Sequence, residues 1–233
     1  MSAVKIEPLG EDALLLRLDR RIDPDLNARV HTLARRLEAA RPPWLQEVVP
    51  AYASLALCVD TQSVELEAAV DAVRALLADE DAAPAPEPSP DGVVEIPVCH
   101  APSFAPDLDA LAARAGLARA EAVALHCAGE YRVAMTGFAP GFPYLLGLDP
   151  RLATPRLATP RTRVPAGSVA IGGAQTGIYP RQGPGGWHLV GRTPVALFDP
   201  AREPPCLLLP GARVRFVAID EARFHALSAG AGP

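Results

Sequence analysis

Glycine and proline are concentrated in one segment of the chain, residues 137–191, where they could build rigid loops that bring backbone N–H groups close to a ligand. The segment holds 11 of the 18 glycines. Glycine permits positive φ and close backbone approach, and proline stiffens the same loops. Three loop-like strings stand out: GFAPGFPYL (137–145), VPAGSVAIGGAQTGIYP (164–180) and PGGWH (184–188). Ordinary turn chemistry in a β protein is the alternative explanation.

The charge of this region favours recognition of a carboxylate or a phosphate. Residues 150–198 contain no Asp or Glu. The same stretch contains six arginines: Arg151, Arg156, Arg161, Arg163, Arg181 and Arg192. A guanidinium binds either kind of anion through paired N–H donors. The alternative is that an acidic surface, on the first part of the chain or on a partner, neutralises this face.

Side chains for acid–base or nucleophilic chemistry are few. His126 ends a predicted helix, in the string LHCAGEY (125–131), and could be a general acid or base or a structural residue. Ser168, in AGSV, lacks the GxSxG elbow of hydrolases. No two histidines have the spacing of metal ligands, so we expect no metal site. Aromatic residues beside the glycines are expected to line a cleft or fill the core: Phe138, Phe142, Tyr144, Tyr179 and Trp187.

Composition excludes several function classes. Lys5, in an opening strand pattern, is the only lysine, so this chain alone supports neither a Walker A loop nor a Schiff base. The net charge of −5 argues against a nucleic-acid binder. The four cysteines form no CxxC pair and are expected to be reduced and mostly buried. We find no signal-peptide pattern and no long apolar run, and we expect a cytoplasmic protein.

A segment rich in proline and acidic residues, 81–92, predicts a linker between a small domain over 1–80 and a larger one over 93–233. Residues 1–92 hold 9 basic and 17 acidic residues, whereas residues 93–233 hold 13 and 10. An acidic first part and a mildly basic second part suggest surfaces with different tasks.

The first domain is expected to be α+β, with two helices on one small antiparallel sheet. Asp23 and Pro24 predict the start of the first helix, on which His31 is expected to be solvated. Ser63 could cap the second helix. The expected strands cover residues 4–8, 13–18, 48–49 and 55–59.

The second domain is expected to be a β-barrel or sandwich, since many short β runs are separated by turn signals. A strand over 93–98 and helices over 107–115 and 119–127 come first. The later runs cover residues 131–135, 168–171, 187–190, 195–198, 206–209 and 213–218.

Taken together, these motifs resemble a known family. The strings GFxPGFPYL, PRxxVPAGSVxIGGxQTGxYP, PGGWxLxGxT and LFDP are similar to those of the B-type subunit of 5-oxoprolinase, also described as allophanate hydrolase subunit 1 or KipI. They also resemble subdomain C and D of the carboxyltransferase region of urea carboxylase. The resemblance extends over nearly the whole chain. It implies an α+β fold, with a small N-terminal α+β domain followed by a cyclophilin-like β-barrel.

The resemblance implies a hydrolase subunit that opens 5-oxo-L-proline to L-glutamate, with ATP used at the level of the complex. It implies a C-type partner chain with a related barrel, and a possible third, A-type subunit. Two alternatives within the family stay open: an allophanate hydrolase or urea carboxylase-type subunit, and a KipI-like inhibitor of a sensor histidine kinase. Prolyl isomerisation, by analogy with cyclophilin, is a third alternative.

The resemblance also assigns residues to roles. Catalysis is expected to involve His126, Arg161 and Gln175, and replacing Arg161 by alanine is expected to abolish activity without unfolding the chain. Substrate binding is expected from ten residues: Phe138, Gly141, Tyr144, Arg156, Ser168, Gly172, Gly173, Thr176, Tyr179 and Trp187. Residues 133–136 (VAMT) and 181–183 (RQG) depart from the family pattern, which leaves the identity of the substrate open.

Overall fold

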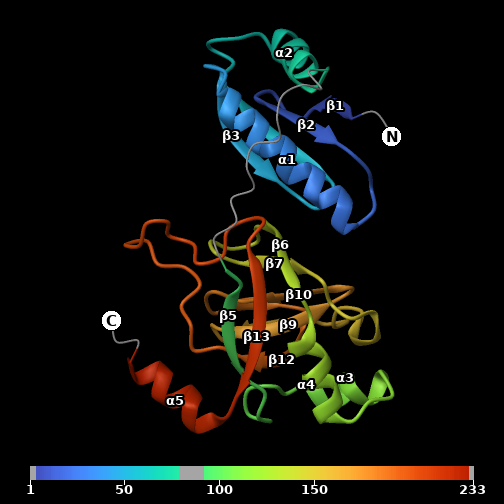
Figure 1. Ribbon diagram of the computed structural model, residues 1–233, viewed down its shortest axis with the longest axis vertical. Coiled ribbons are helices and arrows are strands. Elements are labelled where there is room, and N and C mark those ends of the chain that lie inside the picture. The colour runs from blue at the N-terminus through green and yellow to red at the C-terminus, as the bar shows by residue number, and fades with distance from the viewer. Residues whose placement is uncertain (1–3, 79–91, 231–233) are drawn as a thin grey trace. The chain divides into compact units, whose positions relative to one another are not determined.

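The computed structural model describes residues 4–78 and 92–230, and the chain divides into two compact units, Met1–Ser89 and Pro90–Pro233 (Figure 1). The first unit has its own hydrophobic core, and so does the second. The linker predicted over 81–92 lies, except for Gly92, outside the described residues. No helix in the described ranges is long and apolar enough to cross a membrane.

The first unit is a four-stranded antiparallel sheet with two helices, α1 (Pro24–Ala40) and α2 (Leu66–Ala78). The strands are β1 (Lys5–Pro8), β2 (Ala13–Arg17), β3 (Leu45–Pro50) and β4 (Ser54–Val59), in the order β1-β2-β4-β3. Side chains alternate along a strand, so every second residue of β4 is buried. These residues share a core with Val30 of α1 and Val73 of α2.

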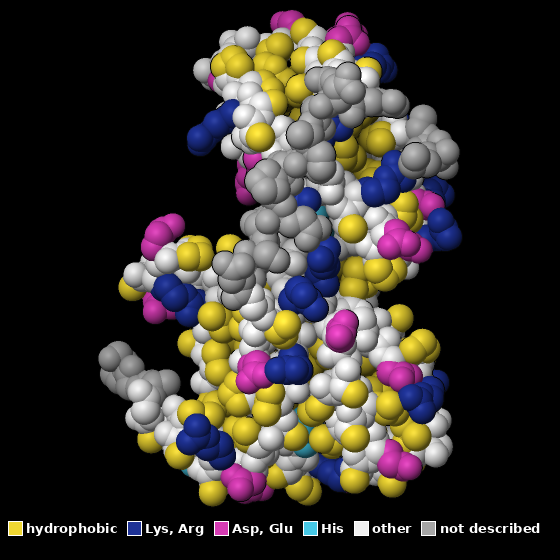
Figure 2. Space-filling view, in the orientation of Figure 1, with side chains coloured by type: hydrophobic (Ala, Val, Ile, Leu, Met, Phe, Trp, Pro, Cys, Tyr) yellow, Lys and Arg dark blue, Asp and Glu magenta, His cyan; other side chains and the backbone are white. Residues whose placement is uncertain are grey.

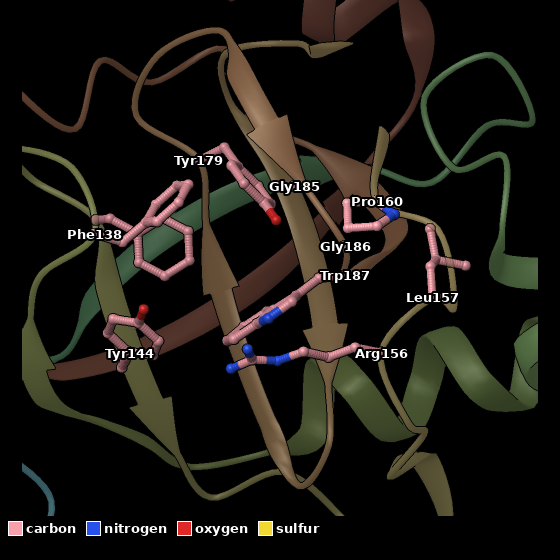
Figure 3. Close-up of a pocket in the computed structure, with 10 residues that line it drawn as sticks. Phe138, Tyr144, Arg156, Leu157, Pro160, Tyr179, Gly185, Gly186 and Trp187 are labelled. Atoms are coloured by element: carbon pink, nitrogen blue, oxygen red, sulfur yellow. The ribbon is translucent and has the colours of Figure 1, made fainter. Parts of the chain in front are cut away.

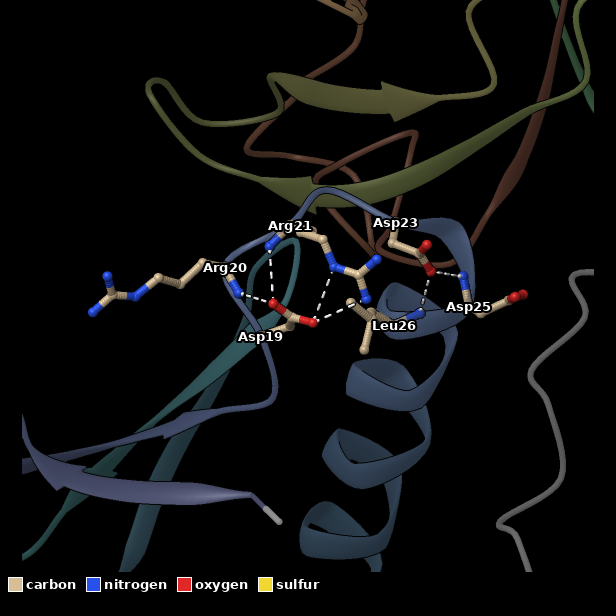
Figure 4. A network of polar contacts seen from close by, with 6 residues as sticks. All are labelled: Asp19, Arg20, Arg21, Asp23, Asp25 and Leu26. Atoms are coloured by element: carbon tan, nitrogen blue, oxygen red, sulfur yellow. Dashed lines mark hydrogen bonds and ion pairs between the residues drawn. The ribbon is translucent and has the colours of Figure 1, made fainter. Parts of the chain in front are cut away.

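Short polar contacts fix the start of α1, as Figure 4 shows. The carboxylate of Asp23 accepts the backbone N–H groups of Asp25 and Leu26, both at 3.0 Å. These N–H groups have no partner within the helix, so the N-cap satisfies them and stabilises the helix by about 1 kcal/mol. In the preceding turn, Asp19 pairs with the guanidinium of Arg21 at 3.1 Å. The predicted helix start is confirmed.

Two details predicted for the first unit are wrong. His31 is only 5% exposed, because the buried face of α1 includes Asn27 and Ala34 as well as Val30. The amide of Asn27 donates to the carbonyl oxygen of Ala51 at 3.1 Å, which turns this polar residue inward. Ser63 does not cap α2, because its hydroxyl donates to the carbonyl of Asp60 in a turn that ends before the helix begins.

The second unit is a closed barrel of seven strands, in the order β10-β7-β6-β13-β5-β12-β9. The barrel strands are β5 (Val94–Cys99), β6 (Tyr131–Thr136), β7 (Pro143–Leu146), β9 (Ser168–Gly172), β10 (Gln175–Ile178), β12 (His188–Arg192) and β13 (Arg213–Ile219). β5 and β13 pair in parallel, and the other barrel pairs are antiparallel. The expected α+β class with a barrel is confirmed.

Further elements flank the barrel. The strands β8 (Arg161–Val164) and β11 (Gly183–Gly185) form a separate two-stranded sheet. The helices are α3 (Leu108–Arg114), α4 (Arg119–Ala128) and α5 (Glu221–Gly230), and η1 (Pro150–Leu152) is a short 3₁₀ turn. Outside the barrel, Arg215 of β13 pairs with Glu95 of β5. Figure 2 shows basic and acidic side chains next to one another over this strand pair.

The strand predictions for the second unit are wrong in two ways. Residues 195–198 and 206–209 are not strands and are joined by an isolated bridge between Phe198 and Cys206. Conversely, β10 lies inside a string predicted as a loop, and so does β7 except for its last residue, Leu146. All four residues of β10 are buried, so the strand shows no alternation of apolar and polar residues. Gly177 in β10 is needed because a Cβ there would lie 2.7 Å from the carbonyl oxygen of Pro143.

Candidate active site

A pocket in the second unit, with a volume of about 180 Å³, is walled mainly by aromatic rings (Figure 3). The rings are those of Phe138, Phe142, Tyr144, Tyr179 and Trp187. Arg156, Leu157 and Pro160, in the loop before β8, and Gly185 and Gly186, around the end of β11, complete the wall. Five of the ten residues predicted for substrate binding therefore lie together: Phe138, Tyr144, Arg156, Tyr179 and Trp187.

The aromatic walls hold one another in place edge to face. The ring of Phe142 lies 5.7 Å from that of Trp187 and 5.2 Å from that of Tyr179, with interplanar angles of 83° and 84°. Tyr144 contacts Trp187 in the same way at 5.8 Å. Each such contact adds about 0.5–1.5 kcal/mol beyond the burial of the ring. The pocket is thus a preformed cavity.

Glycines let these rings lie against the backbone. A Cβ at Gly172 would lie 2.6 Å from the indole of Trp187, and a Cβ at Gly185 would lie 2.3 Å from the hydroxyl oxygen of Tyr179. Real Cβ atoms essentially never come this close to other atoms. Gly172 is therefore required for the position of Trp187, and its direct contact with substrate stays a prediction.

Arg156 supplies a positive charge at the pocket. Its guanidinium carbon lies 5.8 Å from the centre of the Trp187 ring, a cation–π contact (Figure 3). The side chain is exposed, and no carboxylate pairs with it among the described residues. The guanidinium donors that do not face the ring are therefore available to an anionic ligand.

Tyr179 brings a hydroxyl into the wall at only 3% exposure. Burial raises the pKa of this phenol, whereas the nearby backbone N–H of Trp187 lowers it. The nearby Tyr144 raises the pKa further, and the charges of Arg156 and Arg161 lower it. Burial outweighs the groups that lower the pKa, so the phenol keeps its proton and can act as a hydrogen-bond donor.

Phe138 forms the exposed rim of the pocket in a strained conformation. Its φ is +67°, and the N–H of Ala139 donates to the carbonyl of Gly137 at 2.7 Å, which closes a three-residue turn around Phe138. A non-glycine residue in this region costs about 1–3 kcal/mol. The ring is 61% exposed and lies edge-on to Tyr179 at 6.0 Å.

Arg161 does not line the pocket. Its guanidinium pairs with Asp107 at 2.7 Å, and the other carboxylate oxygen of Asp107 accepts the N–H of Leu189 at 2.7 Å. The carboxylate thus joins the start of α3 to β12 and to β8. Since β8 pairs with β11 through Gly185, this ion pair supports the sheet that carries part of the wall. Sequence reasoning missed Asp107, although its place at the start of a predicted helix was a usable signal.

His126 lies inside the barrel at 2% exposure, stacked on Phe216 at 4.6 Å. The hydroxyl of Thr176 donates to the carbonyl of Ala170 at 3.0 Å, so Nε2 of His126 must carry the proton that it donates to Thr176 Oγ1 at 3.1 Å. Nδ1 is left as a buried acceptor without a partner. Burial, followed by the nearby His100, lowers the pKa of His126 to about 3. A neutral histidine in this position supports the barrel, and its catalytic role stays a prediction.

The remaining predicted residues lie outside the pocket wall. Ser168, Gln175 and Thr176 are buried in strands β9 and β10. Gly141 and Gly173 adopt positive φ, at +77° and +65°. Within the described residues, no group of three or more His, Cys, Asp or Glu side chains is placed to hold a metal ion.

Comparison with known proteins identifies the family of this chain. Residues 4–208 match the carboxyltransferase domain, subdomain C and D. The chain belongs to this family. It is 41% identical over 229 residues to the B-type subunit of 5-oxoprolinase from Bacillus subtilis, and the match covers 95% of each chain.

Several solved structures are similar to this chain. The crystal structure of TTHA0988 matches 89% of this chain with a TM-score of 0.78 and 40% identity. The match covers only 40% of the TTHA0988 chain, so in that protein the region similar to this chain is part of a longer polypeptide. Urea carboxylase of Kluyveromyces lactis shares the fold, with a TM-score of 0.77 over 96% of this chain at 20% identity.

Proposed function

We propose that this member of the family is one component of an ATP-dependent 5-oxoprolinase and that its aromatic pocket binds 5-oxo-L-proline for ring opening to L-glutamate. The observation that carries the proposal is the exposed guanidinium of Arg156 on the wall of a small aromatic pocket. The similarity to the B-type subunit of 5-oxoprolinase from Bacillus subtilis supports the choice of substrate.

The pocket suits the chemistry of this substrate. 5-Oxoproline has a small, nearly flat ring with two apolar CH₂ groups, a carboxylate and a lactam amide. Aromatic faces can bury the CH₂ groups, and Arg156 can bind the carboxylate through two parallel hydrogen bonds. The edge-to-face packing of Phe142 and Tyr144 against Trp187 holds the walls of this small pocket, about 180 Å³ in volume, in place around such a ligand.

ATP would be used at the level of the complex, where its hydrolysis drives the opening of an otherwise unreactive amide. The only lysine of the chain is Lys5, in the first unit, so no lysine phosphate loop is available at the pocket. We therefore assign binding and orientation of the lactam to this chain and propose that a C-type partner, with a further A-type subunit, completes the nucleotide site in the cytoplasm. The longer TTHA0988 chain supports the idea that this unit works together with further sequence.

The test is coupled turnover by the reconstituted complex, measured as 5-oxoproline-dependent formation of glutamate and ADP. We expect Arg156→Ala to raise KM by roughly 10- to 100-fold, because a charge-assisted contact to a carboxylate contributes about 1.5–3 kcal/mol. Arg163→Ala is the matched control, since Arg163 is an exposed arginine on the neighbouring strand β8 and does not line the pocket. Wild-type kinetics in Arg156→Ala, or no turnover by a fully assembled complex, would contradict the proposal.

A further inference from the structure

The surroundings of the Tyr179 hydroxyl determine where its proton can point. The backbone N–H of Trp187 lies near the phenolic oxygen and lowers the pKa of the phenol, so a donor already faces the oxygen from this side. A phenol carries a single proton, and a buried hydroxyl almost always donates it. The side chain is only 3% exposed and lines the pocket, and its hydroxyl donates no hydrogen bond to the described residues. The proton is therefore free to be donated to a ligand in the pocket.

The backbone around Tyr179 makes room for the hydroxyl itself. The nearest atom to a Cβ at Gly185 would be the hydroxyl oxygen, at 2.3 Å, ahead of two ring carbons at 2.7 Å. A glycine at this position thus leaves space for a phenol where any other residue would displace it. Figure 3 shows the hydroxyl of Tyr179 beside Gly185, on the side of the pocket that faces Trp187.

We propose that Tyr179 is the residue that recognises the carbonyl group of the ligand, with its hydroxyl donating a hydrogen bond to the lactam oxygen while Arg156 binds the carboxylate. This inference rests on the proposed function of the pocket. It makes the site selective for ring carboxylates that carry a carbonyl acceptor over those that do not. Because the lactam oxygen gains negative charge when the carbonyl carbon is attacked, the same hydrogen bond becomes stronger along the reaction.

Calorimetric titration of the assembled complex with two ligands of the same shape tests the proposal. 5-Oxo-L-proline has the carbonyl, and cyclopentanecarboxylate has the ring and carboxylate alone. We expect Tyr179→Phe to weaken binding of 5-oxo-L-proline by roughly 3- to 10-fold, the effect of one lost hydrogen bond, and to leave binding of cyclopentanecarboxylate unchanged. Arg156→Ala should weaken both ligands equally, which separates carboxylate recognition from carbonyl recognition.

A second variant covers the case in which Tyr179→Phe does not fold. Gly185→Ala displaces the hydroxyl without removing it and should produce the same selective loss. Equal loss of both ligands in these variants, or unchanged binding of 5-oxo-L-proline, would overturn the role of Tyr179 while the proposed function stands. If the wild-type complex binds neither ligand, the proposed function and this inference both fail.

Discussion

Replacing Gly172 by alanine tests whether the pocket depends on the close approach of the Trp187 indole ring to the backbone of residue 172. The new Cβ would lie 2.6 Å from three atoms of the Trp187 ring, whereas nonbonded carbons rest at about 3.5–4.0 Å. The ring must therefore move by about 1 Å. Phe142, Tyr144 and the guanidinium of Arg156 all contact this ring, so the displacement also disturbs them. Overpacking of this kind costs about 1–3 kcal/mol.

The assay combines thermal unfolding with ligand binding. At about 2–4 °C per kcal/mol for a chain of this size, Gly172→Ala should lower Tm by several degrees and weaken binding of 5-oxo-L-proline. Gly183→Ala is the control, because a Cβ at Gly183 would have no atom within 4 Å. A melting temperature and an affinity equal to those of the wild type would refute the view that Gly172 positions Trp187.

Two further predictions concern groups outside the pocket wall. Asp107→Ala should lower the free energy of unfolding by about 2–4 kcal/mol in urea titrations, because it leaves the Arg161 guanidinium and the Leu189 N–H without their acceptor. Asp109→Ala, which removes an exposed ion pair from the same helix, should cost at most about 1 kcal/mol. The folded-state pKa of His126, about 3, lies below its ordinary value of 6.5, so the unfolded chain takes up the proton first and stability falls as pH drops from 6.5 towards 3. His126→Gln should reduce the slope of the free energy of unfolding against pH over this range by up to about 1.4 kcal/mol per pH unit. An unchanged slope, measured by urea titrations at several pH values, would show that this histidine is not buried in its neutral form.

Local signals in the sequence were sufficient for the elements with regular patterns. The N-cap of α1 follows from Asp23 and Pro24, and β13 follows from the alternation of buried and exposed residues over 213–218. β10 could not be predicted in this way, because a strand buried on both faces has no alternation. The aromatic residues of the pocket were found because they lie beside glycines, but the sequence does not show that Gly172 and Gly185 contact rings instead of ligand.

The features of the site that could not be predicted depend on contacts between residues that are far apart in the sequence. Arg161 was predicted as catalytic, yet its partner Asp107 lies 54 residues earlier in the chain, and nothing local connects the two. His126 ends a helix, and whether it faces solvent or the barrel interior depends on how α4 packs against β13. Such facts depend on tertiary placement, which composition and periodicity do not encode.

The parallel pairing of β5 with β13 has a consequence for how the polypeptide folds during translation. Glu95 and Arg215, which pair across these strands, are separated by 120 residues, so the second unit cannot close its barrel until residue 219 has left the ribosome. All four strands of the first unit's sheet lie within residues 5–59, so this unit can fold much earlier during translation than the second unit. Loop closure over so long a span slows folding, and the nascent second unit exposes unpaired strand edges until synthesis is almost finished. Termination of translation before β13 is synthesised should therefore yield a folded first unit attached to an unfolded, aggregation-prone part of the second unit.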